Sequence, residues 1–309
     1  MKNFENKAEQ EIKISEIILC GWENKFLIIA ATFIFALSGL FYSLSLPDIY
    51  TSDSLLVKAK DSKATNTSFN SVLRASGVNF DSGTLDDGGI AQETINSRDF
   101  LAHLLTFPDV LPSLMASLEY NQETKQLIFD ERIYDSKEKK WVGGQEGIPS
   151  FLNIYKEYTR NVVFVDYDRS RGFMRISVSH KSPIFAKEFL DLIIAEVNEN
   201  IRQYDLQRTN EHLDYLEREL KGNGYKEVKT AMNSILESQL ITKMQSMISK
   251  EYTIRKISAP FVPGEKASPW RTGICLGFTF LGAFLSFAFV IIRQYFFADL
   301  QKILKASKN

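Results

Sequence analysis

The sequence predicts an α+β protein in which two transmembrane helices flank an exported α/β domain with one very long helix and a helical hairpin extension. Three observations support this fold class. Two uncharged apolar runs lie near the two ends of the chain, strand-like stretches follow the first run and precede the second, and one helical pattern continues for about 40 residues.

The apolar runs cover residues 26–47 and 272–292. At 1.5 Å per residue, a helix of either length spans roughly 30 Å, the thickness of the bilayer's hydrocarbon core. A core helix of a soluble domain rarely stays apolar on every face for so long. We therefore expect two spans. A cleaved signal peptide followed by one anchor is the alternative, because Ser43 and Ser45 form a small-x-small pattern near the end of the first run.

Two spans would place both termini on the same side of the membrane. The segments 1–25 and 293–309 each carry four cations, and short termini of this kind ordinarily face the cytoplasm. The sequence thus predicts a cytoplasmic N-terminal segment, a cytoplasmic tail, and a domain of residues 48–271 on the outer side. In the inner membrane of a Gram-negative bacterium, that domain is periplasmic.

Charge and cysteine content restrict the classes of partner. Of the chain's 37 basic and 38 acidic residues, the terminal segments hold eight and six, which leaves 29 and 32. This slightly acidic remainder gives no reason to expect nucleic acid or phosphate as a ligand. The two cysteines, Cys20 and Cys275, lie beside the first span and within the second, so the exported domain is not a disulfide scaffold.

The first part of the exported segment mixes one strand with a polar stretch and a helix. Alternation predicts a strand in "IYTSDSLLVKA" directly after the first span. Residues 61–91 are expected to be loop, with a short helix around "NSVLRA", because 19 of these 31 residues are Ser, Thr, Asn, Asp or Gly. A helix should then begin at "NSRDFLAHLL", with Ser97 or Asn96 as its N-cap.

The middle part adds a helix and a hairpin. Residues 130–150 are polar and rich in Gly, which predicts an exposed excursion. Ser150 can then cap a helix through "FLNIYKEYTRN". Two strands, "VVFVDY" and "GFMRISVS", are expected to form a hairpin joined at "DRSRG".

The strongest helical pattern begins after Ser182, a good N-cap, with Pro183 at the first helical position. The pattern predicts a helix over about 183–221, roughly 60 Å long. A helix of this length must leave the core and pack on a returning helix or on another copy of the chain. The "GNGY" at 222–225 predicts the turn, a second helix follows over 226–250, and "EYTIRKIS" predicts the last strand.

No motif predicts catalysis. The sequence contains no phosphate-binding glycine loop, no paired zinc histidines and no nucleophile elbow. The three histidines are far apart in sequence: His103, His180 and His212. We therefore expect no enzyme activity, no catalytic or metal-binding residue, and no cofactor.

A proline segment, "ISAPFVPGEKASPWR" at 257–271, leads into the second span. Because proline fixes φ and lacks a donor, this stretch should be extended and should pair poorly through its N–H side. Trp270 and Arg271 are of the types that favour the headgroup layer. We expect the segment to couple the last strand to the second span.

Small residues in the two spans suggest that the spans pack closely. Gly273 and Gly277 form a GxxxG pattern, and Gly39 and Ser43 form a similar small pair in the first span. Because the spans run in opposite directions, both pairs would lie in the periplasmic half. The alternative is that these are ordinary small residues of a span.

The order of these features resembles the polysaccharide co-polymerase family, and within it the O-antigen chain-length determinants of the Wzz type. The local stretches that carry the resemblance are "INSRDFLAHLL", "IYDSKEKKWVGG", "MRISVSHKSPIFAKEFLDLIIAEVNENI" and "EYTIRKISAPFVPGEKASPWR". Pro260, Pro263 and Pro269 match the family's proline-rich motif before the second span, although its spacing varies among members. The resemblance covers nearly the whole chain.

The resemblance implies an inner-membrane protein that forms a ring-like homo-oligomer, with long helices projecting from the membrane. It implies a role in setting the modal length of lipopolysaccharide O-antigen without making glycosidic bonds. The implied partners are other copies of the chain, the O-antigen polymerase, the growing polysaccharide or its lipid-linked form, and membrane lipids, with no nucleic acid.

Two alternatives remain at this point. One is an adaptor for capsule or exopolysaccharide export, and the other is a two-span periplasmic ligand sensor. Relatives that export capsule often add a cytoplasmic tyrosine kinase. That branch is not expected here, because residues 293–309 contain no Walker motif.

Overall fold

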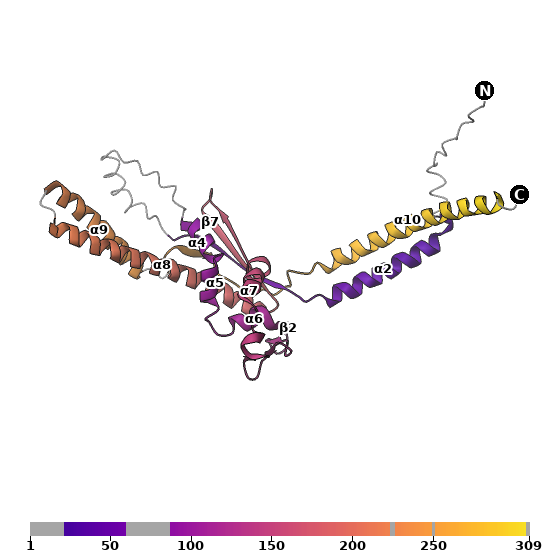
Figure 1. The fold of residues 1–309 in the computed structure, drawn as a ribbon, viewed down its shortest axis with the longest axis horizontal. Coiled ribbons are helices and arrows are strands. Elements are labelled where there is room, and N and C mark those ends of the chain that lie inside the picture. The colour runs from indigo at the N-terminus through magenta and orange to yellow at the C-terminus, as the bar shows by residue number, and fades with distance from the viewer. Residues whose placement is uncertain (1–21, 60–86, 223–225, 249–250, 307–309) are drawn as a thin grey trace, which may run out of the picture. The chain divides into compact units, whose positions relative to one another are not determined.

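The structure is a computed structural model that describes residues 22–59, 87–222, 226–248 and 251–306. The chain divides into two compact units (Figure 1). Residues 48–267 form a mixed α/β unit with a long helical hairpin, and residues 1–47 and 268–309 contain two candidate membrane helices. The predicted fold class is confirmed.

A four-stranded antiparallel sheet organises the α/β unit. Its strands, in the order β6-β7-β1-β8, are β6 Val163–Asp168, β7 Phe173–His180, β1 Tyr50–Lys58 and β8 Ile254–Ser258. Every second residue of β1 from Tyr50 to Leu56 is buried, which is the alternation expected of a sheet with one covered face. All four predicted strands are confirmed. The predicted β6–β7 turn is also present, with Gly172 in the left-handed region at φ 72°.

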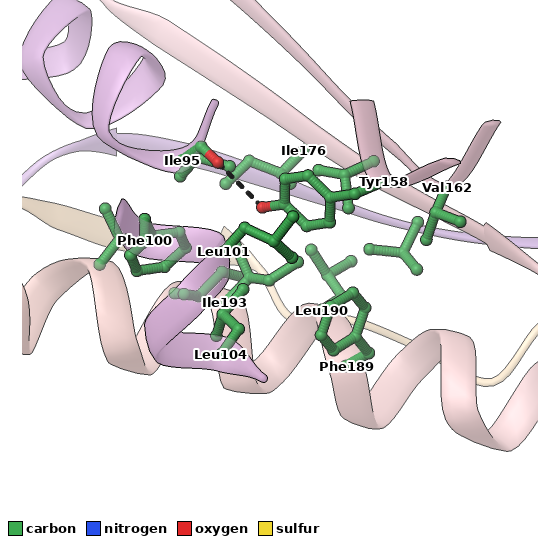
Figure 2. Packing of buried hydrophobic residues seen from close by; sticks show 14 of the residues in the cluster. Ile95, Phe100, Leu101, Leu104, Tyr158, Val162, Ile176, Phe189, Leu190 and Ile193 are labelled. Atoms are coloured by element: carbon green, nitrogen blue, oxygen red, sulfur yellow. Dashed lines mark hydrogen bonds between the residues drawn. The ribbon is translucent and has the colours of Figure 1, made fainter. Parts of the chain in front are cut away.

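Helices cover the inner face of this sheet. They are α4 Asp87–Ile95, α5 Arg98–Leu104, α7 Phe151–Glu157 and the first half of α8 Pro183–Gly222. The core between the layers is apolar, and Figure 2 shows part of it, with Tyr158 between the sheet and the helices. The Tyr158 hydroxyl donates to the Ile95 carbonyl at 2.9 Å, so its polar atom is satisfied inside the core.

The N-cap serines resolve two expectations. Ser97 Oγ accepts the Phe100 N–H at 3.1 Å, so Ser97 rather than Asn96 caps α5. Ser182 Oγ accepts the Phe185 N–H at 3.2 Å at the start of α8. Ser150 precedes α7 as predicted but makes no side-chain capping bond, and the helix passes into a π-helical turn, η2 Tyr158–Val162.

Helix α4 corrects one expectation. Residues 87–91, predicted as loop, are helical, and the two glycines that suggested a loop, Gly88 and Gly89, are buried. A Cβ atom at Gly88 would collide with the ring of Tyr167, so glycine is required here by close packing rather than by a turn. The helix expected around "NSVLRA" lies outside the described residues.

Residues 106–149 hold elements that the sequence did not reveal. They are α6 Val110–Ala116, β2 Ser117–Asn121, β3 Gln126–Phe129, β4 Tyr134–Asp135, β5 Lys140–Trp141 and η1 Gly144–Gly147. We call residues 117–149 the lateral lobe. Most of it is exposed, as predicted for 130–150, but Tyr134 is buried between the rings of Phe129 and Trp141, at 5.4 and 5.3 Å.

Helix α8 has 40 residues and is therefore about 60 Å long. Its first half lies on the sheet, and its second half packs against α9 Lys226–Ile248 (Figure 1). Leu213 and Leu216 are buried there, outside the main core. The predicted hairpin extension is confirmed, although residues 223–225 of its turn lie outside the described residues.

The second unit pairs α2 Lys25–Ser45 with α10 Arg271–Ala306. Both are long and apolar enough to cross a membrane, and only 11% and 17% of their apolar windows are buried. The core helix of a soluble protein would be mostly buried, so this exposure favours helices that face lipid.

Candidate functional site: the membrane-proximal segments

The two chain ends of the α/β unit meet beside the start of β1. The Ala267 N–H donates to the Ile49 carbonyl at 2.8 Å, and Lys266 Nζ lies 3.1 Å from a carboxylate oxygen of Asp48. We call this the tethered end of the unit, because each of these chain ends leads directly to one of the candidate membrane helices.

Helix α8 runs along the sheet from the tethered end. It begins at Pro183, just after His180, which pairs with Tyr50 at the start of β1. Fifteen residues later, Asn198 contacts Ile254, which pairs with Lys58 at the other end of β1. The remaining residues of α8, 199–222, therefore project beyond the sheet by about 36 Å.

One buried side chain fixes this crossing. Asn198 Oδ1 accepts the N–H groups of Thr253 and Ile254 at 2.8 and 3.0 Å, and Asn198 Nδ2 donates to the Ile254 carbonyl at 3.0 Å. Two turns further along α8, Asp205 accepts the hydroxyl of Tyr252 at 2.9 Å, and burial raises the pKa of Asp205. The long helix is thus hydrogen-bonded to the strand that precedes the proline segment.

Serines of β1 hold the first part of the proline segment. Ser54 Oγ donates to the Ser258 carbonyl at 2.6 Å, and Ser52 Oγ donates to the Phe261 carbonyl at 2.7 Å. Pro260 and Pro263 are buried against the unit. The segment therefore attaches through carbonyl groups, which prolines leave available. The role of these serines was not predicted from the sequence. Polar side chains at two of the alternating inward positions of β1 could have indicated that they bond to a neighbouring segment.

The second part of the segment starts α10. Pro269 is half-buried, and Trp270 is 75% exposed. The Arg271 N–H donates to the Pro269 carbonyl at 2.9 Å. A Cβ atom at Gly273 would collide with the Trp270 ring, so Gly273 allows the ring to lie against the first turn of α10. A headgroup role for Trp270 and Arg271 stays a prediction.

The two candidate spans pack through reciprocal Phe–Gly contacts. A Cβ atom at Gly39 would lie 2.6 Å from Cβ of Phe278, and one at Gly282 would lie 2.5 Å from Cβ of Phe35. The order of these pairs shows that α2 and α10 are antiparallel. Ser43, one turn beyond Gly39, is 1% exposed.

The predicted GxxxG contact is wrong at Gly277. No side chain or backbone lies within 4 Å of a Cβ placed there, because Gly277 is on the outward face of α10. The structure therefore brings Gly39 and Ser43 into the packed face but leaves Gly277 out of it, and Gly282 was missed. A shared pattern could have revealed it, since "FALSG" at 35–39 and "FTFLG" at 278–282 both read Phe-x-x-x-Gly.

Two side chains at the β7–α8 junction contact helix α6 and the lateral lobe. His180 Nε2–H donates to the Ser113 carbonyl at 2.9 Å, and its Nδ1 accepts the Ser182 N–H at 3.0 Å. Burial lowers the pKa of His180 to about 4, so the ring is neutral near pH 7. Lys181 Nζ donates to the Ser117 carbonyl at 2.6 Å, and burial lowers the pKa of this lysine.

Among the described residues, no group of three or more His, Cys, Asp or Glu side chains could hold a metal ion. The contacts of the tethered end hold the base of the helical projection against the sheet and against the strand that precedes the proline segment.

Comparisons with known proteins found similarity to one family model and to solved structures. Residues 10–106 match the family model "Wzz: Chain length determinant protein". The chain is similar to a solved full-length bacterial polysaccharide co-polymerase at 10% identity, over 92% of this chain and 98% of that chain, with a TM-score of 0.39. It is also similar to a fragment of WzzB, a polysaccharide co-polymerase from Salmonella Typhimurium, at 14% identity, over 72% of this chain and 100% of that fragment, with a TM-score of 0.28.

None of the curated proteins matches the chain. The family match covers the first candidate span, strand β1, and helices α4 and α5. Strand β1 starts at the tethered end, and β1, α4 and α5 all contribute side chains to the core. The likeness of this chain to the chain length determinant family therefore lies in residues 10–106.

Proposed function

We propose that this protein is a non-enzymatic regulator that sets the modal length of lipopolysaccharide O-antigen. It acts as a homo-oligomeric scaffold beside the O-antigen polymerase in the inner membrane of a Gram-negative bacterium. The match of residues 10–106 to the chain length determinant family carries this proposal. Both termini are cytoplasmic, and the α/β unit with its helical hairpin is periplasmic.

The geometry supports a scaffold. Helix α8 extends about 60 Å from the tethered end, and hydrogen bonds from Asn198 and Asp205 fix its base. A long helix that is rigid at its base presents the same surface at the same height in every copy. Such a device can organise a polymerase or a growing glycan without bond-making groups of its own.

An exposed apolar stripe on α9 supports association with further copies. Leu240, Met244 and Met247 are exposed and recur at i, i+4 and i+7, so they lie on one face of the helix. Apolar surface of this kind marks protein contacts. The other proposed partners are the polymerase, the growing polysaccharide or its lipid-linked form, and membrane lipids.

Deletion of the gene in the source bacterium, followed by gel analysis of lipopolysaccharide, tests this proposal. We expect a clustered ladder to become an unregulated one, and the full chain supplied in trans to restore the cluster. A Met244→Asp variant should restore it poorly, whereas Ser234→Asp, at an exposed polar position of the same helix, should restore it fully. An unchanged ladder after deletion contradicts the proposal. A changed capsule or exopolysaccharide with an unchanged ladder assigns the protein to that polymer instead.

A further inference from the structure

Large apolar side chains are exposed along the lateral lobe and the first turn of α7. Six of them form what we call the apolar patch: Ile128, Ile133, Val142, Ile148, Phe151 and Leu152. Soluble domains rarely expose this many apolar side chains in one segment unless the surface meets a partner or a membrane. Neither the core nor the proposed scaffold function uses these residues.

Backbone contacts show that most of the patch is continuous. The Val142 N–H donates to the Ile133 carbonyl at 2.9 Å. Gly147 lies so close to the Val142 carbonyl that a Cβ atom would collide with it, which places the neighbouring Ile148 beside Val142. Phe151 and Leu152, the first residues of α7, follow Ile148 by three and four positions. Backbone contacts thus join Ile133, Val142 and Ile148, and the chain leads directly from them to Phe151 and Leu152.

The lobe is held at the tethered end. The ring of Tyr120 lies 6.4 Å from that of Tyr50, and Gln122 Nε2 donates to the Tyr50 hydroxyl at 2.7 Å. Helix α2 ends at Ser45, five residues before Tyr50. The lobe is therefore anchored on a residue that follows a candidate span by only five positions in the sequence.

The net charge of the lateral lobe does not favour binding to anionic lipids. Residues 117–149 contain five cations and seven acids, so the lobe is not a basic surface that anionic lipids would attract. Burial of apolar side chains in the boundary between headgroups and acyl chains needs no such charge. The exposed side chains, rather than the lysines of the lobe, are thus the candidate for a lipid contact.

We propose that the apolar patch of the lateral lobe docks on the outer surface of the bilayer that α2 and α10 cross. This interfacial contact is a third membrane attachment of each chain, in addition to the two spans. It rests on the membrane insertion that the proposed function includes. Exposed isoleucine, valine, phenylalanine and leucine side chains fit lipid. The lobe that carries them is hydrogen-bonded to Tyr50, only five positions after a candidate span.

Quenching of a fluorescent label by lipid tests the contact in the full-length protein. Cys20 and Cys275 are replaced by serine, and single cysteines are introduced as Val142→Cys or Leu152→Cys. Phe173→Cys is the matched control, because Phe173 is also apolar and exposed but lies at the other end of the sheet. Each variant carries an environment-sensitive fluorophore in vesicles of phosphatidylethanolamine and phosphatidylglycerol that contain headgroup-spin-labelled phosphatidylcholine.

We expect the spin-labelled lipid to quench the label at positions 142 and 152 and to leave the label at 173 unchanged. Equal fluorescence at all three positions, in protein that resists extraction by alkaline carbonate, overturns the lipid contact but not the proposed function. Cross-linking of Val142→Cys between copies without lipid quenching also overturns it and assigns the patch to a second copy. Extraction of the protein by carbonate overturns the membrane insertion on which both proposals rest.

Discussion

Asn198 shows how one buried polar side chain can determine where a long helix meets a sheet. A helix with an apolar face can slide along a sheet at small cost, because hydrophobic contact has no direction. The amide of Asn198 removes this freedom, since its oxygen and nitrogen match the N–H and carbonyl groups at the start of β8. This match fixes the point on the sheet from which the second half of α8 projects.

Replacement of Asn198 by alanine should destabilise the α/β unit by about 2–4 kcal/mol, because the buried N–H groups of Thr253 and Ile254 would lose their acceptor. Thermal unfolding of the detergent-solubilised protein, followed by circular dichroism, measures the effect. The exposed Asn210 on the same helix provides the control, and Asn210→Ala should change stability by less than about 0.5 kcal/mol. Equal losses for the two variants would contradict the role of Asn198.

His180 predicts a loss of stability in mild acid. Burial lowers the pKa of His180 from the ordinary histidine value of 6.5 to about 4 in the folded protein, so the unfolded chain takes up a proton first as pH falls. The contribution of His180 is fully present above pH 6.5 and is lost progressively down to about pH 4. At pH 5 the loss should be about 2 kcal/mol. His180→Gln should be less stable at pH 7 but lose less on acidification, whereas His212→Gln, at an exposed site, should keep the wild-type pH profile.

The capping serines could be predicted from the sequence, whereas the glycine at the contact between the two candidate spans could not. The difference has a physical cause. Ser97 and Ser182 act on N–H groups three residues away, so their role depends on local order alone. Gly277 and Gly282 are both glycines on one helix. Which of them faces α2 depends on the rotation of α10, and local sequence does not specify that rotation.

At the scale of elements, the paired Phe-x-x-x-Gly patterns make α2 and α10 one packed hairpin. Each phenylalanine sits over the glycine of the other helix, so a side chain at either glycine would push the helices apart. In lipid, where no hydrophobic force joins two apolar helices, this close van der Waals contact is the main attraction between them.

Gly282→Leu should weaken this hairpin by about 1–3 kcal/mol through overpacking, and Gly277→Leu should leave it intact. The thermal stability of the purified protein in detergent reports the difference, with Gly277→Leu as a control of identical chemistry on the same helix. Similar destabilisation by both substitutions would show that α10 is rotated from the orientation described above.

The distal half of the α8–α9 hairpin depends on Leu213 and Leu216, which are buried away from the sheet. Replacement of both by alanine should expose the amides of residues 203–222 and 226–248 to hydrogen exchange while those of the sheet stay protected. Tyr215→Ala removes a larger but exposed side chain between them, so it should leave the exchange pattern unchanged. Loss of protection throughout the α/β unit would instead show that the hairpin and the sheet unfold as one.

Elements with a clear period were predictable, and those without one were not. β1 and β7 alternate between buried and outward positions, and α8 carries a proline start and a serine cap. β2, by contrast, has two adjacent exposed residues and a register shift, so its sequence shows no alternation. α6 is as short as α5 and α7, but those two helices follow a serine, whereas α6 contains Pro112 and follows Asp109, whose side chain makes no capping bond.

At the scale of the whole molecule, the proposed topology places the lateral lobe and the N-terminal segment on opposite sides of the membrane. In intact cells with a permeabilised outer membrane, Glu123→Cys should react with a membrane-impermeant maleimide, and the natural Cys20 should react only after the inner membrane is broken. Cys275→Ser is included throughout to remove the cysteine of the second span. Labelling of Cys20 in intact cells would contradict two spans with cytoplasmic termini.

The position of β1 between β7 and β8 has a consequence for how the chain folds. In the register of the sheet, Leu55 faces Arg175 on one side and Ser258 on the other, so the first strand finds its partners about 120 and 200 residues later. Closing loops of that length costs entropy before any contact is gained, and such non-local pairing slows folding. Since residue 258 is only 13 positions from the start of α10, the sheet is completed only when synthesis has almost reached the second span. Until then, at least one edge of β1 stays unpaired while the first candidate span is already synthesised, so the strand waits for most of the chain before the sheet is complete.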